Sequence, residues 1–417
     1  MRAAFRFALA LPLTLGACSL TSDLDALRGS DASADATPDV VVPQKGFTLD
    51  VAPSYVISDP GETHAVTVTL TRAPGFTDPV NVALNAPPPD AGISQQTSVL
   101  FTDQASAPMT FKVDGKATGT GSPYQIEVAG QSGIYTSKAN FFLHIGTLLA
   151  TSTSIVTNVT VKLPTYATSV DVKLWGGGGG GGSYDGTCNP SSGGAGGGGG
   201  FLSATIPVAP SSVLELVVGG GGTTKNGSGA GGGGYSAVRV GTTPIAIAGG
   251  GGGGGRNACA ATSGSTEGMP GHATTTPFNS CTGKNGTSSA GGAGGGNGGA
   301  GMQLTGGNAA SGTVKGGVPG GGLGGAGGGG GAGAYGGGAG GTCNAGTNPG
   351  GGGGGSGFAP TNATAVSIVA GSGTAPGAAS DPDNGGAGVG GTEGAYPGNN
   401  PTLGANGKVI VRLTKTK

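Results

Sequence analysis

The sequence predicts an all-β protein in which one β-sandwich is followed by a second sandwich that carries long runs of glycine. Up to residue 146, short segments of alternating apolar and polar residues recur between turn-forming residues, which is the pattern of half-buried strands. From residue 150 onward, similar segments alternate with runs of glycine, which supplies 99 of the 417 residues. The predicted folded units are 46–146 and 150–417; in the second, strands at 155–248 and 364–415 flank a glycine-rich insertion at 249–357.

The N-terminal region has the features of an exported protein. Two arginines flank the start of an apolar stretch at 7–15, which predicts a secretory signal peptide over 1–17, too short to span a bilayer stably. The sequence Leu-Gly-Ala-Cys at 15–18 resembles a bacterial lipobox, which implies cleavage before Cys18 and lipidation of its thiol. Position 19 is Ser. An Asp at this position would resemble the inner-membrane retention signal, so the resemblance favours the outer membrane. We therefore expect a protein lipid-anchored to the outer membrane, facing the periplasm or the cell surface. The alternative is an ordinary signal peptide with an incidental cysteine.

The next segment and the overall charge narrow the expectations further. Residues 18–45 are rich in Ser, Asp and Ala, a composition that buries too little apolar surface to fold, so we predict a disordered tether. Charged residues make up 9% of the chain and the net charge is −1. A nucleic-acid partner is not expected, because such binding needs a basic surface.

The first folded unit has the strand spacing of an Ig-like β-sandwich. In the segment from His64 to Arg72, Val66, Val68 and Leu70 share one face, as period-two alternation requires. The stretches "APGFTDPVNVAL" and "YQIEVAGQSGIYTSKANFFLHI" resemble bacterial Ig-like repeats, which implies a spacer or an accessory binding module. His64 and His144 are expected at exposed strand positions. Seven short strands are predicted, at 47–53, 64–72, 79–85, 98–103, 109–114, 124–130 and 139–145.

The second unit combines sandwich strands with a long insertion. In the segment 212–218, Leu214 and Leu216 occupy one face and Val217 the other, which indicates a strand near the centre of a sandwich. After Ala248, about a hundred residues pass without a strand pattern before strands return. Strands that bracket such an insertion predict a jelly-roll-like sandwich.

The glycine runs are predicted to form polyglycine II helices. Such helices have three residues per turn and rise about 3.1 Å per residue, so the seven glycines at 176–182 would span about 22 Å. Without side chains, neighbouring helices can approach closely enough for their backbone groups to bond to one another, as buried backbone groups must. Residues other than glycine should then point outward. In 320–337, Leu323, Ala326, Ala332 and Tyr335 share one phase of a three-residue period.

Four cysteines follow Cys18 in this exported chain, which predicts two disulfides. Three pairings are open for Cys188, Cys259, Cys281 and Cys343. Closeness in sequence favours Cys259–Cys281, which leaves Cys188–Cys343. A zinc site is the alternative, but the chain has no Cys-x-x-Cys pair and only His272 lies nearby.

No motif predicts catalysis, a cofactor or a bound metal. Asp381, Asp383 and Asn384 could bind calcium, but the twelfth position of the loop is Thr392 rather than Glu, so a surface turn is favoured. The chain contains three histidines, and no Ser-His-Asp arrangement can be assembled from them. We expect a protein that is not an enzyme.

The order of strands and glycine runs resembles a known family. "VDVKLWGGGGGGG", "GGAGGGGGFLSATIPV", "LELVVGGGG", "GGGGYSAVRV" and "AIAGGGGGGG" follow one another as in the glycine-rich domains of the anaplastic lymphoma kinase ectodomain and of bacterial and phage surface proteins. The resemblance implies a tumour-necrosis-factor-like jelly roll with a bundle of polyglycine helices, and partner binding without catalysis. In phage adhesins of this kind the loops joining the helices contact receptors; here the loops would be 183–192, 223–229, 256–288, 302–319, 342–349 and 374–402.

These expectations combine into a cell-surface lipoprotein that acts as a binding or adhesion module through its loops. The candidate ligand contacts are Tyr184, Arg256, Phe278 and Tyr396, and the expected partner is a surface glycan or an envelope protein. By analogy with jelly rolls, a trimer is the expected oligomer. The alternative is a structural envelope or matrix component without a dedicated ligand, and an enzyme with an unrecognised site is a third hypothesis.

Overall fold

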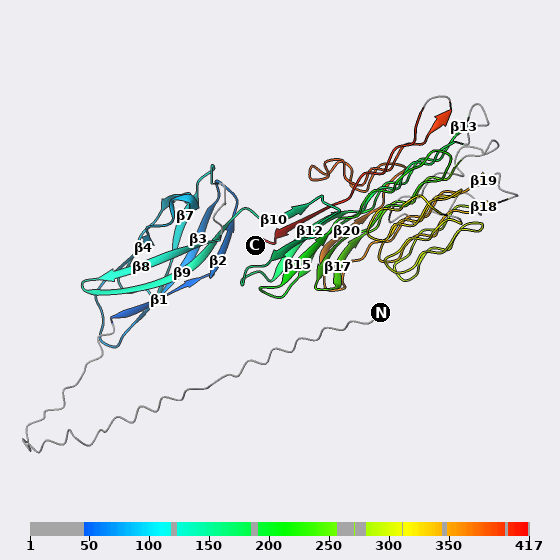
Figure 1. Ribbon diagram of the computed structural model, residues 1–417. Coiled ribbons are helices and arrows are strands. Elements are labelled where there is room, and N and C mark those ends of the chain that lie inside the picture. Colours follow the sequence, from blue (N-terminus) through cyan, green and yellow to red (C-terminus); the bar gives the residue numbers. More distant parts are fainter. Residues whose placement is uncertain are drawn as a thin grey trace, which may run out of the picture. The chain divides into compact units, whose positions relative to one another are not determined.

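The computed structural model describes residues 46–417, apart from 118–122, 185–190, 257–270, 272–280, 311, 344–347, 397–398 and 416–417. The predicted all-β class is confirmed: in the described residues the strands are interrupted by one short 3-10 helix, Pro89–Ala91. Figure 1 shows the arrangement of the strands and of the glycine runs.

The first sandwich packs a four-stranded sheet of order β1-β3-β7-β5 on a five-stranded sheet of order β2-β9-β8-β4-β6. Val66 and Val68 of β3 are fully buried between the sheets, as the period-two pattern predicts. Nine strands form where seven were expected; the additional ones are the four-residue β2 and β5. The strands are β1 (Phe47–Ala52), β2 (Tyr55–Ser58), β3 (Thr63–Arg72), β4 (Val80–Asn85), β5 (Ile93–Gln96), β6 (Val99–Phe101), β7 (Ser106–Val113), β8 (Tyr124–Ser132) and β9 (Tyr135–Ile145).

The second sandwich packs a five-stranded sheet of order β10-β22-β12-β14-β20 on a four-stranded sheet of order β11-β15-β16-β17. Leu214 and Leu216 of β15 lie in the core between the sheets, and Val217 is buried on the opposite face. The strands are β10 (Leu148–Ser152), β11 (Val159–Lys162), β12 (Ser169–Trp175), β14 (Phe201–Pro207), β15 (Val213–Val217), β16 (Ser236–Val240), β17 (Thr243–Ala248), β20 (Thr364–Val369) and β22 (Lys408–Leu413).

The glycine runs continue from these strands and bond to one another with a three-residue repeat. In the run 176–183, which directly follows β12, every third amide donates to the same neighbouring run. Gly176, Gly179 and Gly182 donate to the run 194–200, at N···O distances of 3.0, 2.9 and 2.8 Å. Three residues per turn is the repeat of polyglycine II, and side-by-side packing of such helices satisfies their backbone groups.

The run 176–183 is surrounded on all sides by other runs. Its amides donate to three neighbours and its carbonyls accept from three more, and all eight residues are buried. The runs 327–334 and 336–341 occupy two further positions of the same kind. The six neighbours of 176–183 are 194–200, 228–234 and 402–405, to which it donates, and 219–222, 249–255 and 388–394, from which it accepts.

Close approach of the chains explains why these positions are glycine. A Cβ atom added at Gly179 would lie 2.0 Å from the carbonyl oxygen of Gly252, and one added at Gly181 would lie 1.8 Å from that of Thr392. Both atoms belong to backbone, which cannot move aside as a side chain can. The bundle therefore excludes every side chain at these positions.

The expectation that residues other than glycine point outward is only partly right. Leu323, Ala326 and Tyr335 are half-buried, but Ala332 is fully buried and Ala334 nearly so. The reason is that this part of the bundle packs on the outer face of the four-stranded sheet. Its apolar contacts there are Val217, Tyr235, Ala237 and Ile247.

The expectation of exposed histidines is wrong. His144 of β9 is buried, and its Nδ1 lies 3.1 Å from the hydroxyl oxygen of Tyr166. His64 of β3 is half-buried, with its Nε2 3.5 Å from a carboxylate oxygen of Glu62. Burial lowers the pKa of both imidazoles. A strand pattern places a side chain on a face but does not reveal that Tyr166, 22 residues further along the chain, covers His144.

Candidate functional site

Several predicted loops meet at one end of the glycine bundle, which we call the loop end. It comprises Ser183 and Tyr184, the turn 224–228, Arg256, and the described residues 395–396 and 399–400. The amide of Ser183 donates to the carbonyl of Ser228 at 3.0 Å, and its hydroxyl accepts from the amide of Gly227 at 3.1 Å. The turn 224–228 is thereby fixed to the end of the central run 176–183.

A second set of contacts joins the other loops to this end. The short strand β13 (Ser191–Ser192) pairs antiparallel with β21 (Ala395–Tyr396). The side-chain amide of Asn226 donates to the Oδ1 of Asn400 at 3.5 Å. Loops that are up to about two hundred residues apart in sequence therefore form one surface of amide, hydroxyl and peptide groups.

The structure places three of the four candidate contact residues at the loop end. Tyr184 directly follows the central run and is half-buried. The amide of Arg256 donates to Ala326 at 3.0 Å, and its guanidinium Nη1 donates to the carbonyl of Gly227 at 3.5 Å. The backbone of Tyr396 is in β21, while its side chain and the whole of Phe278 lie outside the described residues.

Several of the predicted loops are partly built into the bundle. In 302–319, the amides of Gly307 and Gly317 donate to Gly337 and Gly232, at 2.8 Å each. Residues 388–394 of the predicted loop 374–402 form one of the runs around 176–183. The isolated glycines in these stretches provide bundle contacts that their mixed composition did not predict. The segment 342–349 carries the two-residue strands β18 (Thr342–Cys343) and β19 (Asn348–Pro349), which pair with each other.

The described part of the chain contains one cysteine with a placed side chain. Cys281 is buried and disulfide-bonded. Cys18, Cys188 and Cys259 lie outside the described residues, as does the side chain of Cys343. The pairing of Cys259 with Cys281 and of Cys188 with Cys343 stays a prediction.

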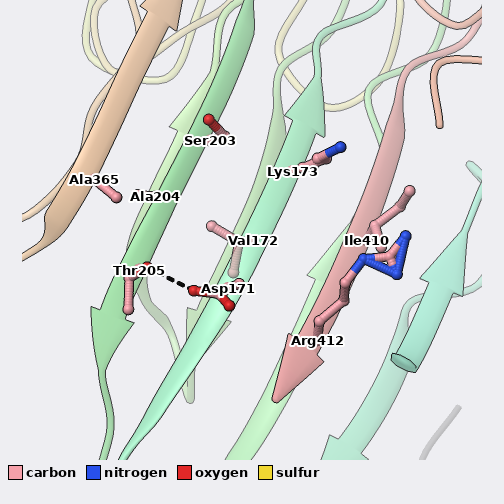
Figure 2. Close-up of a pocket in the computed structure, with 9 residues that line it drawn as sticks. All are labelled: Asp171, Val172, Lys173, Ser203, Ala204, Thr205, Ala365, Ile410 and Arg412. Carbon is pink, nitrogen blue, oxygen red and sulfur yellow. Dashed lines mark hydrogen bonds between the residues drawn. The ribbon is translucent and has the colours of Figure 1, made fainter. Parts of the chain in front are cut away.

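A shallow groove lies on the outer face of the five-stranded sheet, across β12, β14 and β22 (Figure 2). Its volume is about 190 Å³. The Oδ1 of Asp171 accepts hydrogen bonds from the hydroxyls of Thr205, at 2.5 Å, and Thr414, at 3.1 Å. Drug-sized ligands occupy pockets of about 300 Å³ or more, so the groove can hold only a smaller molecule.

The lysine and arginine side chains of this face form ion pairs with the loop of Asp381 and Asp383, for which calcium binding was the alternative to a surface turn. Lys173 Nζ lies 2.8 Å from a carboxylate oxygen of Asp381 and 2.9 Å from one of Asp383. Arg412 Nη2 lies 2.9 and 3.0 Å from the two carboxylate oxygens of Asp383. Hydrogen bonds from Lys173 and Arg412 hold the pKa of Asp383 below its ordinary value. Asn384 forms hydrogen bonds within its own turn. Asp381 and Asp383 therefore tie a surface turn to the sheet.

This ion-pair network was not foreseen from the sequence. The alternation of β12 and β22 places Lys173 and Arg412 on the polar face of the sheet. It does not reveal a partner 208 residues away in the chain. Among the described residues, no three His, Cys, Asp or Glu side chains are grouped as metal ligands, and no helix has the length and apolarity to cross a membrane.

Comparison with known proteins identifies the second part of the chain. The family model described as "Glycine-rich domain" matches residues 152–375. No curated protein matches the chain. Among solved structures, a marsupial T cell receptor is similar over 41% of this chain and 93% of its own, with 9% identity and a TM-score of 0.16, a likeness that carries no argument. Because the matched region exceeds half of the 417 residues, the chain belongs to the glycine-rich domain family.

Proposed function

We propose that the protein is a non-enzymatic binding module of the bacterial cell surface and that its loop end contacts the partner. The observation that carries the proposal is the attachment of the loops to a bundle whose buried runs bond to neighbours on every side. Binding residues typically lie on loops held by a rigid scaffold, and fixed loops lose less conformational entropy when they bind.

The chemistry of the loop end favours a polar partner such as an envelope glycan. Lys225, Asn226 and Asn400 are exposed there, and amide and hydroxyl groups can exchange hydrogen bonds with sugar hydroxyls. In this proposal Tyr184, Arg256, Phe278 and Tyr396 add aromatic and cationic contacts. An envelope protein is the second class of partner to be tested.

The rest of the chain would then present the loop end to its partner. In this proposal Cys18 carries the lipid, residues 18–45 are the tether, and the first sandwich is an Ig-like spacer. The jelly-roll-like second sandwich holds the bundle. Two disulfides stabilise the loops that contain the four cysteines.

A pair of exposed substitutions tests the proposal with the full chain. Purified protein is titrated against insoluble cell-wall glycan and against outer-membrane extract, and saturable binding is expected to one of them. The double variant Asn226→Ala with Asn400→Ala should weaken that binding, because both side chains are exposed at the loop end. The matched control is Thr361→Ala with Asn362→Ala, which changes exposed residues in the turn before β20.

The outcomes separate binding from a structural role. Saturable binding that falls in the loop-end variant and not in the control supports the proposal. Absence of saturable binding to either probe, or equal binding by both variants, contradicts it and leaves the structural coat or matrix component.

A further inference from the structure

The edge strand β20 is exposed on both of its faces. Every residue from Thr364 to Val369 is exposed, including Val366 at 45%, Ile368 at 49% and Val369 at 37%. The strand pairs on one side with β14 and has no strand on the other side in the described structure. Its free side therefore offers backbone groups that pair with no other described residue, flanked by β-branched side chains, which is a template for another strand.

Each of the other edge strands of the second sandwich is paired with another segment, carries a charge or has an irregular register. The free edge of β17 is taken by Phe358, which exchanges two backbone hydrogen bonds of 2.9 Å with Ile247. The edge strand β11 carries Lys162, and β10 has an irregularity between Leu148 and Ala150. Charges and bulges of this kind discourage edge-to-edge pairing.

In β20 such protection is confined to its N-terminal part. The register with β14 shifts between Ser203 and Thr205, and Ala365 has a positive φ of 50°, which indicates a bulge. Beyond it, Ser367, Ile368 and Val369 pair regularly with β14. The chain from 316 to 380 contains no charged residue, so two copies of this edge can approach each other without charge repulsion.

We propose that β20 pairs antiparallel with β20 of a second copy of this chain, about a two-fold axis at Ile368. This register is centred beyond the bulge, on residues 367–369, which pair regularly with β14. Ile368 then faces its own counterpart, and Ser367 faces Val369 of the other copy, so that β-branched side chains meet across the interface. The five-stranded sheets of the two copies become one continuous sheet. A second copy is the occupant because a two-fold contact pairs one surface with itself, and the absence of charge from 316 to 380 lets this strand meet its own copy without repulsion while offering no opposite charge to a charged partner.

The test measures the mass of the full-length protein over a wide range of concentrations by sedimentation velocity. The wild type is expected to pass from monomer to dimer as its concentration rises. Ile368→Lys should weaken dimerisation by about tenfold or more, because two like charges would face each other at the axis. The control is Leu403→Lys, which changes a side chain that is 62% exposed outside β20. Ser367→Lys, at another exposed position of the strand, replaces Ile368→Lys if that variant does not fold.

Cross-linking tests the register. Ile368→Cys should form a disulfide between two copies, because antiparallel neighbours have Cα atoms about 4.5–5.5 Å apart. Leu403→Cys should not. A protein that stays monomeric at every concentration, forms a trimer, or dimerises equally well with Ile368→Lys overturns the proposal.

Discussion

Gly179 shows how strictly the bundle selects its residues. Its amide donates to Gly197 at 2.9 Å while the backbone of Gly252 closes the space where a side chain would begin. In the same bundle, Ala195 is half-buried and its Cβ is accommodated. The backbone around Gly179 closes the position of a Cβ, whereas the surroundings of Ala195 leave room for one.

Replacing Gly179 by Ala should therefore destabilise the protein strongly. Forcing an extra carbon into a packed interior typically costs about 1–3 kcal/mol, and here the obstacle is backbone. Ala195→Ser is the matched control and should change the free energy of unfolding by less than about 0.5 kcal/mol. Denaturant unfolding measures both; equal stabilities of the two variants would refute this account of the glycines.

The pKa of Asp383 makes a second residue-scale prediction. Because Lys173 and Arg412 hold this pKa below its ordinary value of 3.8, the ion pairs stabilise the fold above about that pH. The stabilisation is lost as the pH falls through the lower, folded-state pKa. Asp383→Asn should be less stable than the wild type at pH 7, and the difference should shrink on acidification. Melting temperatures measured across this range test the sign; a difference that is constant with pH contradicts it.

At the scale of elements, Trp175 marks the transition from strand β12 to the central run 176–183. Its side chain is fully buried against Phe201, with ring centroids 4.8 Å apart, and its Nε1 donates to the carbonyl of Gly377 at 3.1 Å. It is the only tryptophan of the chain. Its fluorescence therefore reports on the root of the bundle alone.

We expect blue-shifted tryptophan emission that moves to the red in the same transition that removes the β signal in circular dichroism. The reason is that the root of the bundle and the core of the sandwich share β12. Trp175→Phe should lower the free energy of unfolding by about 1 kcal/mol or more, since it removes a buried hydrogen bond and part of the packing. Two well-separated transitions would show that the bundle and the sandwich unfold independently.

Strands were predictable where alternation was long and their partners were near. The patterns around Val66 and Leu214 indicated which face is buried, and both are in cores. The strand β5 was missed because Ile93 is its only large apolar residue. The strand β2 was missed because it has four residues and pairs in parallel with the distant β9. The three-residue repeat was foreseen from glycine content, but which run bonds to which depends on the whole topology.

At the scale of the whole molecule, the candidate site was predicted as a set of loops rather than as a surface. Their composition indicated turns, and the resemblance to adhesins indicated contact with a partner. The sequence did not show that Asn226 meets Asn400 or that Arg256 reaches Gly227, because these contacts depend on how distant runs line up in the bundle. For the same reason, the sequence predicts β20 as a strand but does not show that it is exposed on both faces.

In the proposed function, the lipid on Cys18 anchors the molecule to the membrane. Cys18→Ser should abolish incorporation of labelled fatty acid and release the protein from membranes, since the lipid chains would supply the anchor. Fractionation of cells that express each form measures this, and Cys188→Ser is the control for loss of a cysteine elsewhere in the chain. Retention of the Cys18→Ser protein in the membrane fraction would contradict lipid anchoring.

The central claim is that the glycine runs form an ordered scaffold whose backbone groups satisfy one another. Amide hydrogen exchange of the intact protein tests it most directly, with the runs 176–183 and 327–341 compared with strand β12. The account predicts that amides such as that of Gly179 exchange as slowly as those of the core strand, because they are buried and bonded to neighbouring runs. Exchange of these glycines at the rate of an unstructured peptide, while β12 stays protected, would contradict it.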